Sequence, residues 1–233
     1  MKTLLVIGAT GDIGQGIVAQ ARRRGWNVVA AARHAGKLAD AFDADDGVAI
    51  VAGDLSSDAG AMALWDNAAR RFGAVDAVVV SVNGPQPARP VIDLGMDEVA
   101  AHYAANVLTH VIAARNVLPR LAPNGILLGI GGGTADFIIP TKVPTSMGHA
   151  ALRMFYRGLA RENRDAASIR ELLVASMVAG ASNRDTALPE WLTDAEIGEH
   201  VCAIIADPAA FPGPILQLRD RDQVGRPPVS AAP

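Results

Sequence analysis

Short apolar runs alternate with longer amphipathic segments along nearly the whole chain. Several runs are unbroken stretches of Val, Ile, Leu and Ala, which is typical of strands buried between two layers of helices. The runs predict strands at residues 3–7, 27–31, 48–51, 77–81, 125–130, 171–176 and 215–218. The segments between them predict helices at residues 13–24, 59–72, 96–121, 146–165 and 194–206. This alternation indicates an α/β fold, a doubly wound sheet of seven mostly parallel strands flanked by helices.

The chain has 233 residues, the size of one large α/β domain, and no linker-like stretch divides it. We therefore expect a single domain over residues 1–220 and a tail without regular structure over residues 221–233. Three loops rich in Gly, Pro or small polar residues follow predicted strands, at 83–90, 131–144 and 179–191. Ligands of open α/β sheets bind at the carboxyl ends of strands, so we expect these loops to frame the site.

The composition argues against several functional classes. The net charge of −3 provides no basic field, so nucleic acid is not an expected partner. One cysteine, Cys202, cannot form an internal disulfide, and no Cys/His cluster has the spacing of a metal site. The apolar run at the N-terminus is too short for a signal peptide, and none reaches the roughly 18 residues that span a bilayer. We expect a cytoplasmic protein that acts on a small molecule and not at a membrane.

The first predicted strand runs directly into a glycine-rich turn, Gly-Ala-Thr-Gly-Asp-Ile-Gly-Gln-Gly over residues 8–16, and a helix follows. Glycines allow a tight turn and a close approach to a pyrophosphate, and the N-terminus of the helix offers free N–H groups to the phosphates. A glycine motif alone is a weak signal, but this one has its strand and its helix. It indicates a dinucleotide-binding Rossmann-type domain. The residues expected to bind the cofactor here are Gly8, Thr10, Gly11, Asp12, Ile13 and Gly14.

The end of the second predicted strand bears on the choice of cofactor. An acidic residue at this point holds the adenosine ribose of NAD, whereas an arginine accommodates the 2′-phosphate of NADP. The strand ends in Ala-Ala-Arg-His, with no carboxylate and with Arg33 as the one guanidinium. Arg33 is able to bind a phosphate through two hydrogen bonds, helped by His34 or Lys37. The sequence therefore favours NADP(H) over NAD.

Further motifs, taken in chain order, resemble the short-chain dehydrogenase/reductase family over nearly the whole chain. Asp54 and Leu55, in VAGDLS, are similar to the pair that contacts adenine, and Asn83-Gly84 resemble the end of the family's strand-four motif. Asn106 lies where the family keeps an asparagine that organises a proton-relay water. The resemblance implies that Asp54, Leu55, Asn83 and Gly84 contact the cofactor. It also implies a homodimer or homotetramer assembled through the long helices.

The catalytic positions depart from that family. The segment HAALRMFYRGLARE resembles the helix after the family's active-site lysine, which aligns His149 with the lysine and Thr145 with the tyrosine. Gly132 aligns with the serine. Neither tyrosine of the chain is followed four residues later by lysine, so no Tyr-x-x-x-Lys motif exists.

Candidate catalytic residues are therefore Asn106, Thr145 and His149. Thr145 is able to orient a substrate but not to replace a phenol. His149 carries an imidazole that ordinarily titrates near pH 6.5, so it either contacts the ribose or acts as the acid. The alternative is that His149 merely begins a helix from which the function has gone.

His102, Asn106 and His110 are spaced by four residues and lie along one helix face. Two histidines at this spacing suggest a metal, but no third ligand completes a site. A helix that packs at a subunit interface is the favoured interpretation.

Three functions fit these residues. The first is an NADP(H)-dependent oxidoreductase that transfers hydride to or from a small carbonyl, alcohol or enone without the usual Tyr/Lys pair. The second is a catalytically silent NADP(H)-binding sensor or regulatory module. The third is a non-redox isomerase or lyase that uses the same cleft with His149 as base. The fold alone does not choose among them.

Overall fold

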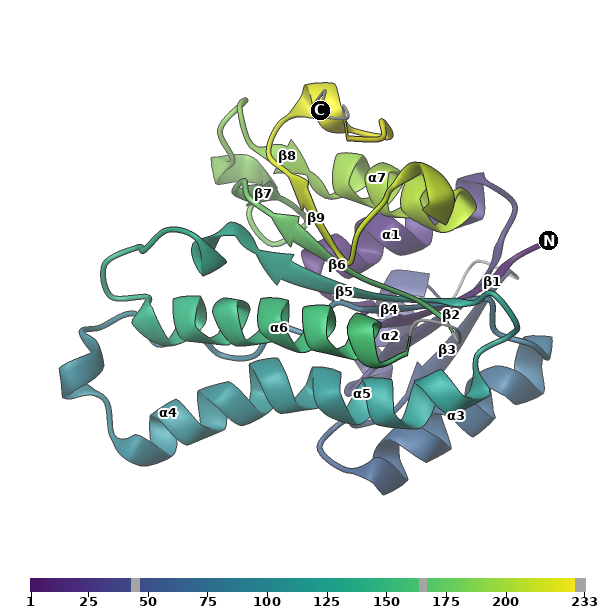
Figure 1. Cartoon of the computed structure of the whole chain (residues 1–233), viewed down its shortest axis with the longest axis horizontal. Coiled ribbons are helices and arrows are strands. Elements are labelled where there is room, and N and C mark those ends of the chain that lie inside the picture. Colours follow the sequence, from purple (N-terminus) through teal and green to yellow (C-terminus); the bar gives the residue numbers. More distant parts are fainter. Residues whose placement is uncertain (43–46, 164–166, 229–233) are drawn as a thin grey trace.

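A central sheet of seven parallel strands lies between two layers of helices in the computed structural model of the chain, which describes residues 1–42, 47–163 and 167–228 (Figure 1). The strand order is β3-β2-β1-β4-β5-β6-β9, and every pair in this sheet is parallel. The strands are β1 (Thr3–Ile7), β2 (Asn27–Ala32), β3 (Val48–Ala52), β4 (Ala77–Val80), β5 (Ile126–Gly132), β6 (Ser168–Val174) and β9 (Ile215–Leu218). The order reverses between β1 and β4, where doubly wound sheets bind their ligands.

Two hydrophobic clusters, one on each face of the sheet, hold the helices in place. Successive side chains of a strand point to opposite faces, and β1 shows this clearly. Leu4 and Val6 pack into one cluster, whereas Leu5 and Ile7 pack into the other. All four are buried because helices cover both faces, which explains why the strands are apolar throughout.

The helices divide into two layers (Figure 1). On one face, side chains of α1 (Asp12–Arg23), α2 (Ala35–Phe42) and α7 (Asp194–Ala206) enter the core. On the other face, side chains of α3 (Asp58–Phe72), α5 (Thr109–Val117) and α6 (Val143–Glu162) do so. Helix α4 (Met96–Tyr103) continues into α5 through one turn of π-helix, Ala104–Leu108.

Close packing of α1 against α7 explains the last glycine of the glycine-rich turn. A Cβ on Gly16 would overlap the backbone carbonyl of Asp194, and a Cβ on Gly198 would overlap the carbonyl of Gly16. The two glycines therefore let the helix backbones touch. Gly16 serves helix packing and not the phosphate site.

The doubly wound architecture predicted from the sequence is confirmed, but several boundaries differ. The predicted helix over 96–121 is interrupted by the π-helical turn and ends in a 3-10 turn, Leu118–Arg120. Helix α2 was not predicted, nor was the small two-stranded sheet of β7 (Val178–Ala179) and β8 (Leu192–Thr193). Strand β5 extends two residues further than predicted, and β6 begins three residues earlier. Helix α6 ends at Glu162, and its predicted end at Asp165 lies outside the described residues.

The predicted tail was wrong in its first part. Arg221–Gln223 form a 3-10 helix, and Arg221 Nε donates to Glu196 Oε1 at 2.7 Å, which ties this segment to α7. Residues 229–233 lie outside the described residues. Within the part of the chain that the structure describes, no helix combines the length and apolarity needed to cross a membrane.

Candidate functional site

The turn between β1 and α1 is built from glycines that nothing larger could replace. Gly8 has a φ of +89°, in the left-handed region that favours glycine. A Cβ on Gly8 would overlap the carbonyl of Ser81, and a Cβ on Gly14 would overlap the carbonyl of Gly8. The N–H groups of Gly8 and Ala9 both donate to Ala31 O, at 2.8 and 3.0 Å. The turn is therefore held rigidly against β2 and β4.

Helix α1 presents its first N–H groups without a cap. Its first backbone hydrogen bond runs from Gln15 N to Gly11 O at 2.9 Å, so the N–H groups of Asp12, Ile13 and Gly14 precede the helical ladder. Gly11 is the N-cap, and no side chain of the described residues caps the helix there. A helix N-terminus in this state suits a pyrophosphate. The turn thus fits the dinucleotide that its sequence suggests.

The side chain of Asp12 is used in a different way from the rest of the turn. Its Oδ1 accepts from Ser182 N at 2.9 Å, and its Oδ2 accepts from Ser182 Oγ at 2.5 Å. These bonds hold the loop after β7 against the start of α1. Asp12 therefore has only its backbone N–H to offer a phosphate, and its carboxylate secures the loop.

The residues expected around the adenosine lie along the carboxyl ends of β2 and β3. Arg33 follows β2 directly and is exposed, as are His34 and Lys37. Asp54 is exposed and accepts hydrogen bonds from the backbone and hydroxyl of Ser56. The side chain of Leu55 packs into the core, so only its backbone is left to meet a ligand.

Asn106 joins the loop after β4 to the π-helical turn. Its Oδ1 accepts from Gly84 N at 2.8 Å, and its Nδ2 donates to His102 O at 2.8 Å. Asn83, one residue earlier in the loop, accepts from Gln86 Nε2 at 2.7 Å. π-Helical turns interrupt α-helices frequently at functional sites. Asn106 is buried, and both ends of its amide are occupied in shaping the loop.

His149 lies beside the end of β5 and is paired with a hydroxyl that the sequence did not single out. Its Nδ1 is 2.6 Å from Thr134 Oγ1, in the 3-10 turn Gly133–Ala135 that follows the strand. A Cβ on Gly132 would overlap the His149 ring, so the missing serine leaves the space that the imidazole fills. The signal in the sequence was a hydroxyl directly after the glycine run of residues 131–133, but only the turn brings it to His149.

Burial changes the acid–base character of His149. Its surroundings, chiefly through desolvation and secondarily through His102, lower its pKa to about 4. The expectation of titration near pH 6.5 was therefore wrong. At neutral pH the ring is uncharged and offers one N–H donor and one nitrogen acceptor.

The other catalytic candidate, Thr145, faces the interior. Its side chain is buried, and Oγ1 has no hydrogen-bond partner among the described residues. The hydroxyl is therefore not presented to a ligand in this structure. The structure brings His149 and Thr134 together, whereas the Thr145 side chain is buried in α6.

The two histidines of the α4–α5 segment pack inside the chain. His102 Nδ1 donates to Pro85 O at 2.9 Å, and His110 Nδ1 lies 3.0 Å from the Tyr156 hydroxyl. Both rings are buried within one chain, and the prediction that this helix packs at a subunit interface stays a prediction. Among the described residues, no group of three or more His, Cys, Asp or Glu side chains is arranged to hold a metal ion.

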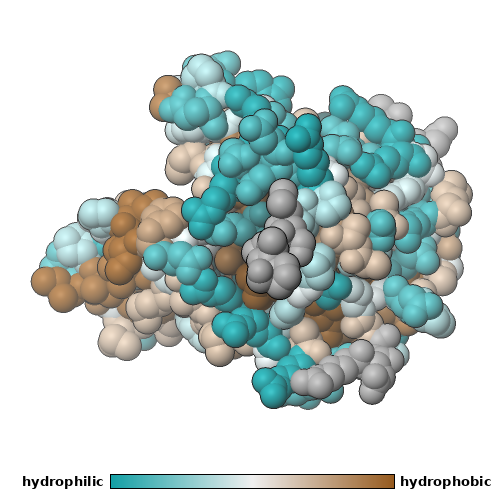
Figure 2. All heavy atoms as spheres, turned by 45° about the horizontal axis from the view of Figure 1, so that its top comes forward, coloured by the Kyte–Doolittle hydropathy of each residue, from teal (hydrophilic) through white to brown (hydrophobic). Residues whose placement is uncertain are grey.

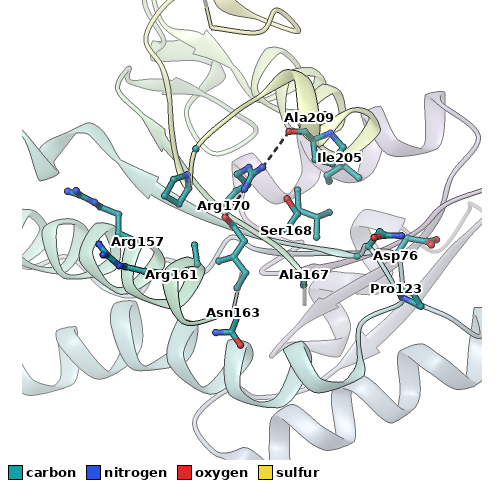
Figure 3. Close-up of a pocket in the computed structure, with 18 of the residues that line it drawn as sticks. Asp76, Pro123, Arg157, Arg161, Asn163, Ala167, Ser168, Arg170, Ile205 and Ala209 are labelled. Carbon is teal, nitrogen blue, oxygen red and sulfur yellow. Dashed lines mark hydrogen bonds between the residues drawn. The ribbon is translucent and has the colours of Figure 1, made fainter. Parts of the chain in front are cut away.

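A large cavity, of about 1000 Å³, lies at the opposite edge of the sheet (Figure 3). Asp76 and Gly125, which precede β4 and β5, and Ser168, which begins β6, line it, so it opens at the amino ends of the strands. Figure 3 shows Arg157 and Arg161 extending to one side while Arg170 reaches toward Pro208 O, 3.5 Å away. These guanidinium groups do not converge on one point, and the cavity is separate from the glycine turn.

Apolar side chains gather at the end of the molecule where α4 and α6 begin (Figure 2). Exposed ones on these segments and on the loop after β5 are Ile92, Met96, Phe137, Ile138 and Met147. This loop is joined to the loop after β4, because Lys142 Nζ lies 3.5 Å from Gln86 O.

Known proteins resemble this chain in sequence. The family model described as short chain dehydrogenase matches residues 2–186. The chain belongs to that family. A short-chain dehydrogenase/reductase, iacG, of Pestalotiopsis fici is 32% identical over 118 residues, which cover 49% of this chain and 48% of the relative. The uncharacterized oxidoreductase YmfI of Bacillus subtilis is 28% identical over 171 residues, 69% of this chain and 68% of the relative.

The first fungal relatives match only in part, since the chain spans about half the length of iacG and 53% of dpchG of Colletotrichum higginsianum. Solved structures match nearly throughout. A short-chain dehydrogenase/reductase of Serratia marcescens has a TM-score of 0.83 at 19% identity, covering 94% of this chain and 96% of that one. An alcohol dehydrogenase of Thermococcus sibiricus, complexed with 5-hydroxy-NADP, has a TM-score of 0.82 at 22% identity, covering 94% and 97%.

These structural matches show the fold, and the family match shows an oxidoreductase family whose members bind nicotinamide cofactors and act on small substrates. The uncapped turn at α1 is in keeping with that membership.

Proposed function

We propose that the protein is an NADP(H)-dependent oxidoreductase that transfers hydride to or from a small carbonyl, alcohol or enone. The observation that carries this proposal is the pair formed by His149 and Thr134 at the carboxyl end of β5. This neutral donor–acceptor pair contains the residue aligned with the family's lysine, one helical turn after the position aligned with its tyrosine, and it lies on the same edge of the sheet as the glycine turn. A protein that only stored a dinucleotide would not need it.

The chain's own groups account for cofactor binding. The N–H groups of Asp12, Ile13 and Gly14 would hold the pyrophosphate, and Arg33 would pair with a 2′-phosphate. Asp54 and the loop of Asn83-Gly84 would border the adenosine and the nicotinamide side, respectively. When bound, the nicotinamide supplies or accepts the hydride. No carboxylate follows β2 to favour the free ribose hydroxyls of NAD.

The proton is assigned to His149. With its proton on Nε2, the ring accepts from Thr134 at Nδ1 and offers the Nε2–H to a substrate oxygen. Because the pKa of His149 is about 4, this donor is present throughout the neutral range. Asn106 acts by shaping the loop at Gly84, and Thr145 supports α6 from within.

The same proposal extends to the domain extent, the location and the assembly of the protein. We propose one domain over residues 1–220, located in the cytoplasm and assembled as a homodimer or homotetramer. Exposed apolar side chains on α4, on the π-helical turn and on α6 support assembly through these helices, since large apolar patches on soluble proteins often mark interfaces. They include Met96, Leu108 and Met154.

The cofactor assignment is tested by titrating NADPH and NADH by nicotinamide fluorescence. We expect NADPH to bind more tightly than NADH. Arg33→Ala should lower the affinity for NADPH about tenfold, which corresponds to a loss of about 1.4 kcal/mol in binding free energy. NADH binding should not change. Arg157→Ala, an exposed arginine at the opposite edge of the sheet, is the matched control. Equal binding of the two cofactors, unaffected by Arg33→Ala, would mean that the assignment is wrong.

Catalysis is tested by following nicotinamide absorbance across a panel of aldehydes, ketones and enones. We expect turnover that falls about 100-fold or more in His149→Asn, the range for loss of a positioned acid or base. NADPH affinity should be kept, and Glu162→Gln, at an exposed residue at the far end of α6, should behave as wild type. Tight NADPH binding without turnover across the panel supports the sensor instead. Conversion of a substrate without oxidation of NADPH supports the isomerase or lyase.

A further inference from the structure

Two glycines of β5 make room for polar side chains deep between the sheet and α6. Gly129 and Gly131 are two residues apart and face the same side of the strand. A Cβ on Gly129 would overlap the hydroxyl end of Tyr156, and a Cβ on Gly131 would overlap Glu171 Oε1. The glycine run of β5 therefore has a purpose beyond the space for His149. It admits a phenol and a carboxyl group into the core.

Glu171 is the most unusual of these groups. It lies in β6, paired in register with Gly129, and is 0% exposed. Neither carboxyl oxygen has a hydrogen-bond partner among the described residues. Burial raises its pKa to about 8, against the opposing influence of Arg153. An unpaired carboxylate in such a place is costly, so the side chain is a neutral acid at pH 7.

Tyr156 and His110 form the next contact toward the site. The Tyr156 hydroxyl is 3.0 Å from His110 Nδ1, and the rings meet edge to face with centroids 5.9 Å apart. Both residues are 0% exposed. The hydroxyl and the Glu171 carboxyl lie beside glycines two residues apart on the same side of β5, and Glu171 acts electrostatically on Tyr156, so internal water would be needed to join them. The carboxyl, the phenol and the imidazole thus form a row.

The far end of this row approaches His149. Burial lowers the pKa of His110 to about 4; the Val82 backbone opposes this, and the proximity of His149 lowers it further. His110 Nε2 is buried, and although the Val82 backbone lies close enough to influence the ring, no hydrogen bond of normal geometry satisfies this nitrogen among the described residues. Buried polar atoms of this kind are commonly linked by an internal water. One such link would connect His110 with the pair of His149 and Thr134.

We propose that Glu171, Tyr156 and His110 form an internal proton path that ends at His149. The path rests on the proposed function, because it serves a reaction that consumes a proton at His149. Nicotinamide and substrate would cover His149 from solvent during that step. A proton source reached from the interior would then remain available to it.

The transfer moves one proton through each group. His149 gives its Nε2 proton to the substrate oxygen while Nδ1 takes the hydroxyl proton of Thr134, and Thr134 regains a proton through water from His110 Nε2. His110 accepts the Tyr156 hydroxyl proton at Nδ1, and Tyr156 accepts the carboxyl proton of Glu171. Glu171 is left as a carboxylate. It regains its proton by the reverse route once product has left and His149 meets solvent.

Few other charges face Glu171. Tyr156 and Arg153 of α6 act on it, and Arg153 is itself paired with Asp136. From β9 only the apolar Ile215 is in register with it. The proton equilibrium of Glu171 is therefore governed by its burial and by this one row of groups.

The first test needs no activity. Infrared spectra of the full chain should show a carboxylic-acid band that persists to about pH 8 and is missing from Glu171→Gln. NMR titration of the imidazoles should show His110 and His149 shifting as Glu171 ionises in wild type, and not in Glu171→Gln. Glu162→Gln, a substitution at an exposed glutamate of the same chain, should give the wild-type spectra. Ionisation of Glu171 near pH 4.5, or unchanged histidine titrations, would overturn the path.

The second test follows the rate of substrate reduction against pH. The wild-type rate should fall about tenfold per pH unit above 8, as the acid form of Glu171 is lost. Glu171→Gln and Tyr156→Phe should be slower below pH 8 and lack this decline, with NADPH affinity unchanged. A wild-type profile in both variants would overturn the path. If wild type itself is inactive, the proposed function fails, and the spectroscopic test still decides whether the groups are coupled.

Denaturation of the same proteins checks that Glu171 is buried as an acid. Between pH 4.5 and 8 the native state holds a proton that the unfolded state has lost, so this group makes stability fall as pH rises. As pH rises from 4.5 to 8, the difference in unfolding midpoint between Glu171→Gln and wild type should therefore shift in favour of the variant. Above pH 8 this difference should stay constant. A difference that is constant across the whole pH range would contradict the assignment.

Discussion

The two halves of the sheet treat their family motifs in opposite ways. Around β1, α1 and β2 the chain keeps glycines whose role is to shape backbone, and the structure places them as the sequence predicts. Around β5 and α6 the alignment predicted from the sequence sets Gly132 and His149 where the family has its serine and lysine. The first half offers a cofactor backbone N–H groups, and these are present whatever the side chains are, once the turn has formed. The second half depends on side chains, so a few substitutions change its chemistry without disturbing the fold.

Glycine itself has a different meaning in the two halves. Gly8 and Gly14 are required because backbone meets backbone, and a carbonyl oxygen cannot move aside. Gly129, Gly131 and Gly132 are required because side chains of α6 and β6 fill the space beside them. The first kind of glycine predicts a turn from sequence alone. The second kind is understood only when the neighbouring side chain is known.

The largest effect is expected in the first half. Gly14→Ala places a Cβ against the carbonyl of Gly8, so the turn must shift. Strain of about 3 kcal/mol is typical of such overpacking and corresponds to about 100-fold weaker NADPH binding, measured by fluorescence titration. Gly36→Ala in α2 is the control, since nothing lies within 4 Å of its Cβ position. Retention of full affinity by Gly14→Ala would mean that the turn does not hold the phosphates.

An effect of similar size, but on turnover and not on binding, is expected from placing a serine at position 132, which aligns with the family's serine. Gly132→Ser puts a Cβ where the His149 ring lies, so the ring must leave its 2.6 Å contact with Thr134. We expect turnover to fall about 100-fold while NADPH affinity stays within about threefold, because only a positioned proton donor is lost. Thr134→Ser keeps the hydroxyl and should remain active, whereas Thr134→Val should not. Faster turnover in Gly132→Ser would show that His149 does not supply the proton.

The smallest effect is expected where the loop after β7 meets the glycine-rich turn. Ser182→Ala removes the 2.5 Å hydrogen bond to Asp12 and frees a carboxylate near the phosphate site. We expect NADPH to bind about fivefold more weakly, from a loss of about 1 kcal/mol. Adding Asp12→Asn should restore affinity, because the uncompensated charge is then gone. Tighter binding in Ser182→Ala would instead show that the loop competes with the cofactor.

Much of the fold could be predicted from the sequence because its strands are apolar on both faces. β1 and β9 were predicted residue for residue, as was α7, whose start at Asp194 is marked by a capping box from Thr193 to Glu196. The π-helical turn could not be predicted, because its residues favour an ordinary helix and tertiary contacts of Asn106 accompany the change.

The candidate site was predictable only in part, because tertiary contacts also decide which of its side chains meet. Asn106 and His149 were found by alignment to a pattern, but Thr134 lies 15 residues from its partner. Thr145 occupies a matching position and yet faces the interior. A side chain's direction depends on the whole packing of α6, and linear spacing does not contain it.

The sequence by itself therefore determined the parallel sheet, the glycine turn and the family, because these follow from local apolar runs and from backbone that glycine alone permits. Tertiary structure determined which polar groups meet. It set His149 beside Thr134, removed Thr145 from reach, and buried Glu171 behind Gly131. Burial and proximity, which arise only when distant segments pack, lower the pKa of His149 to about 4 and raise that of Glu171 to about 8.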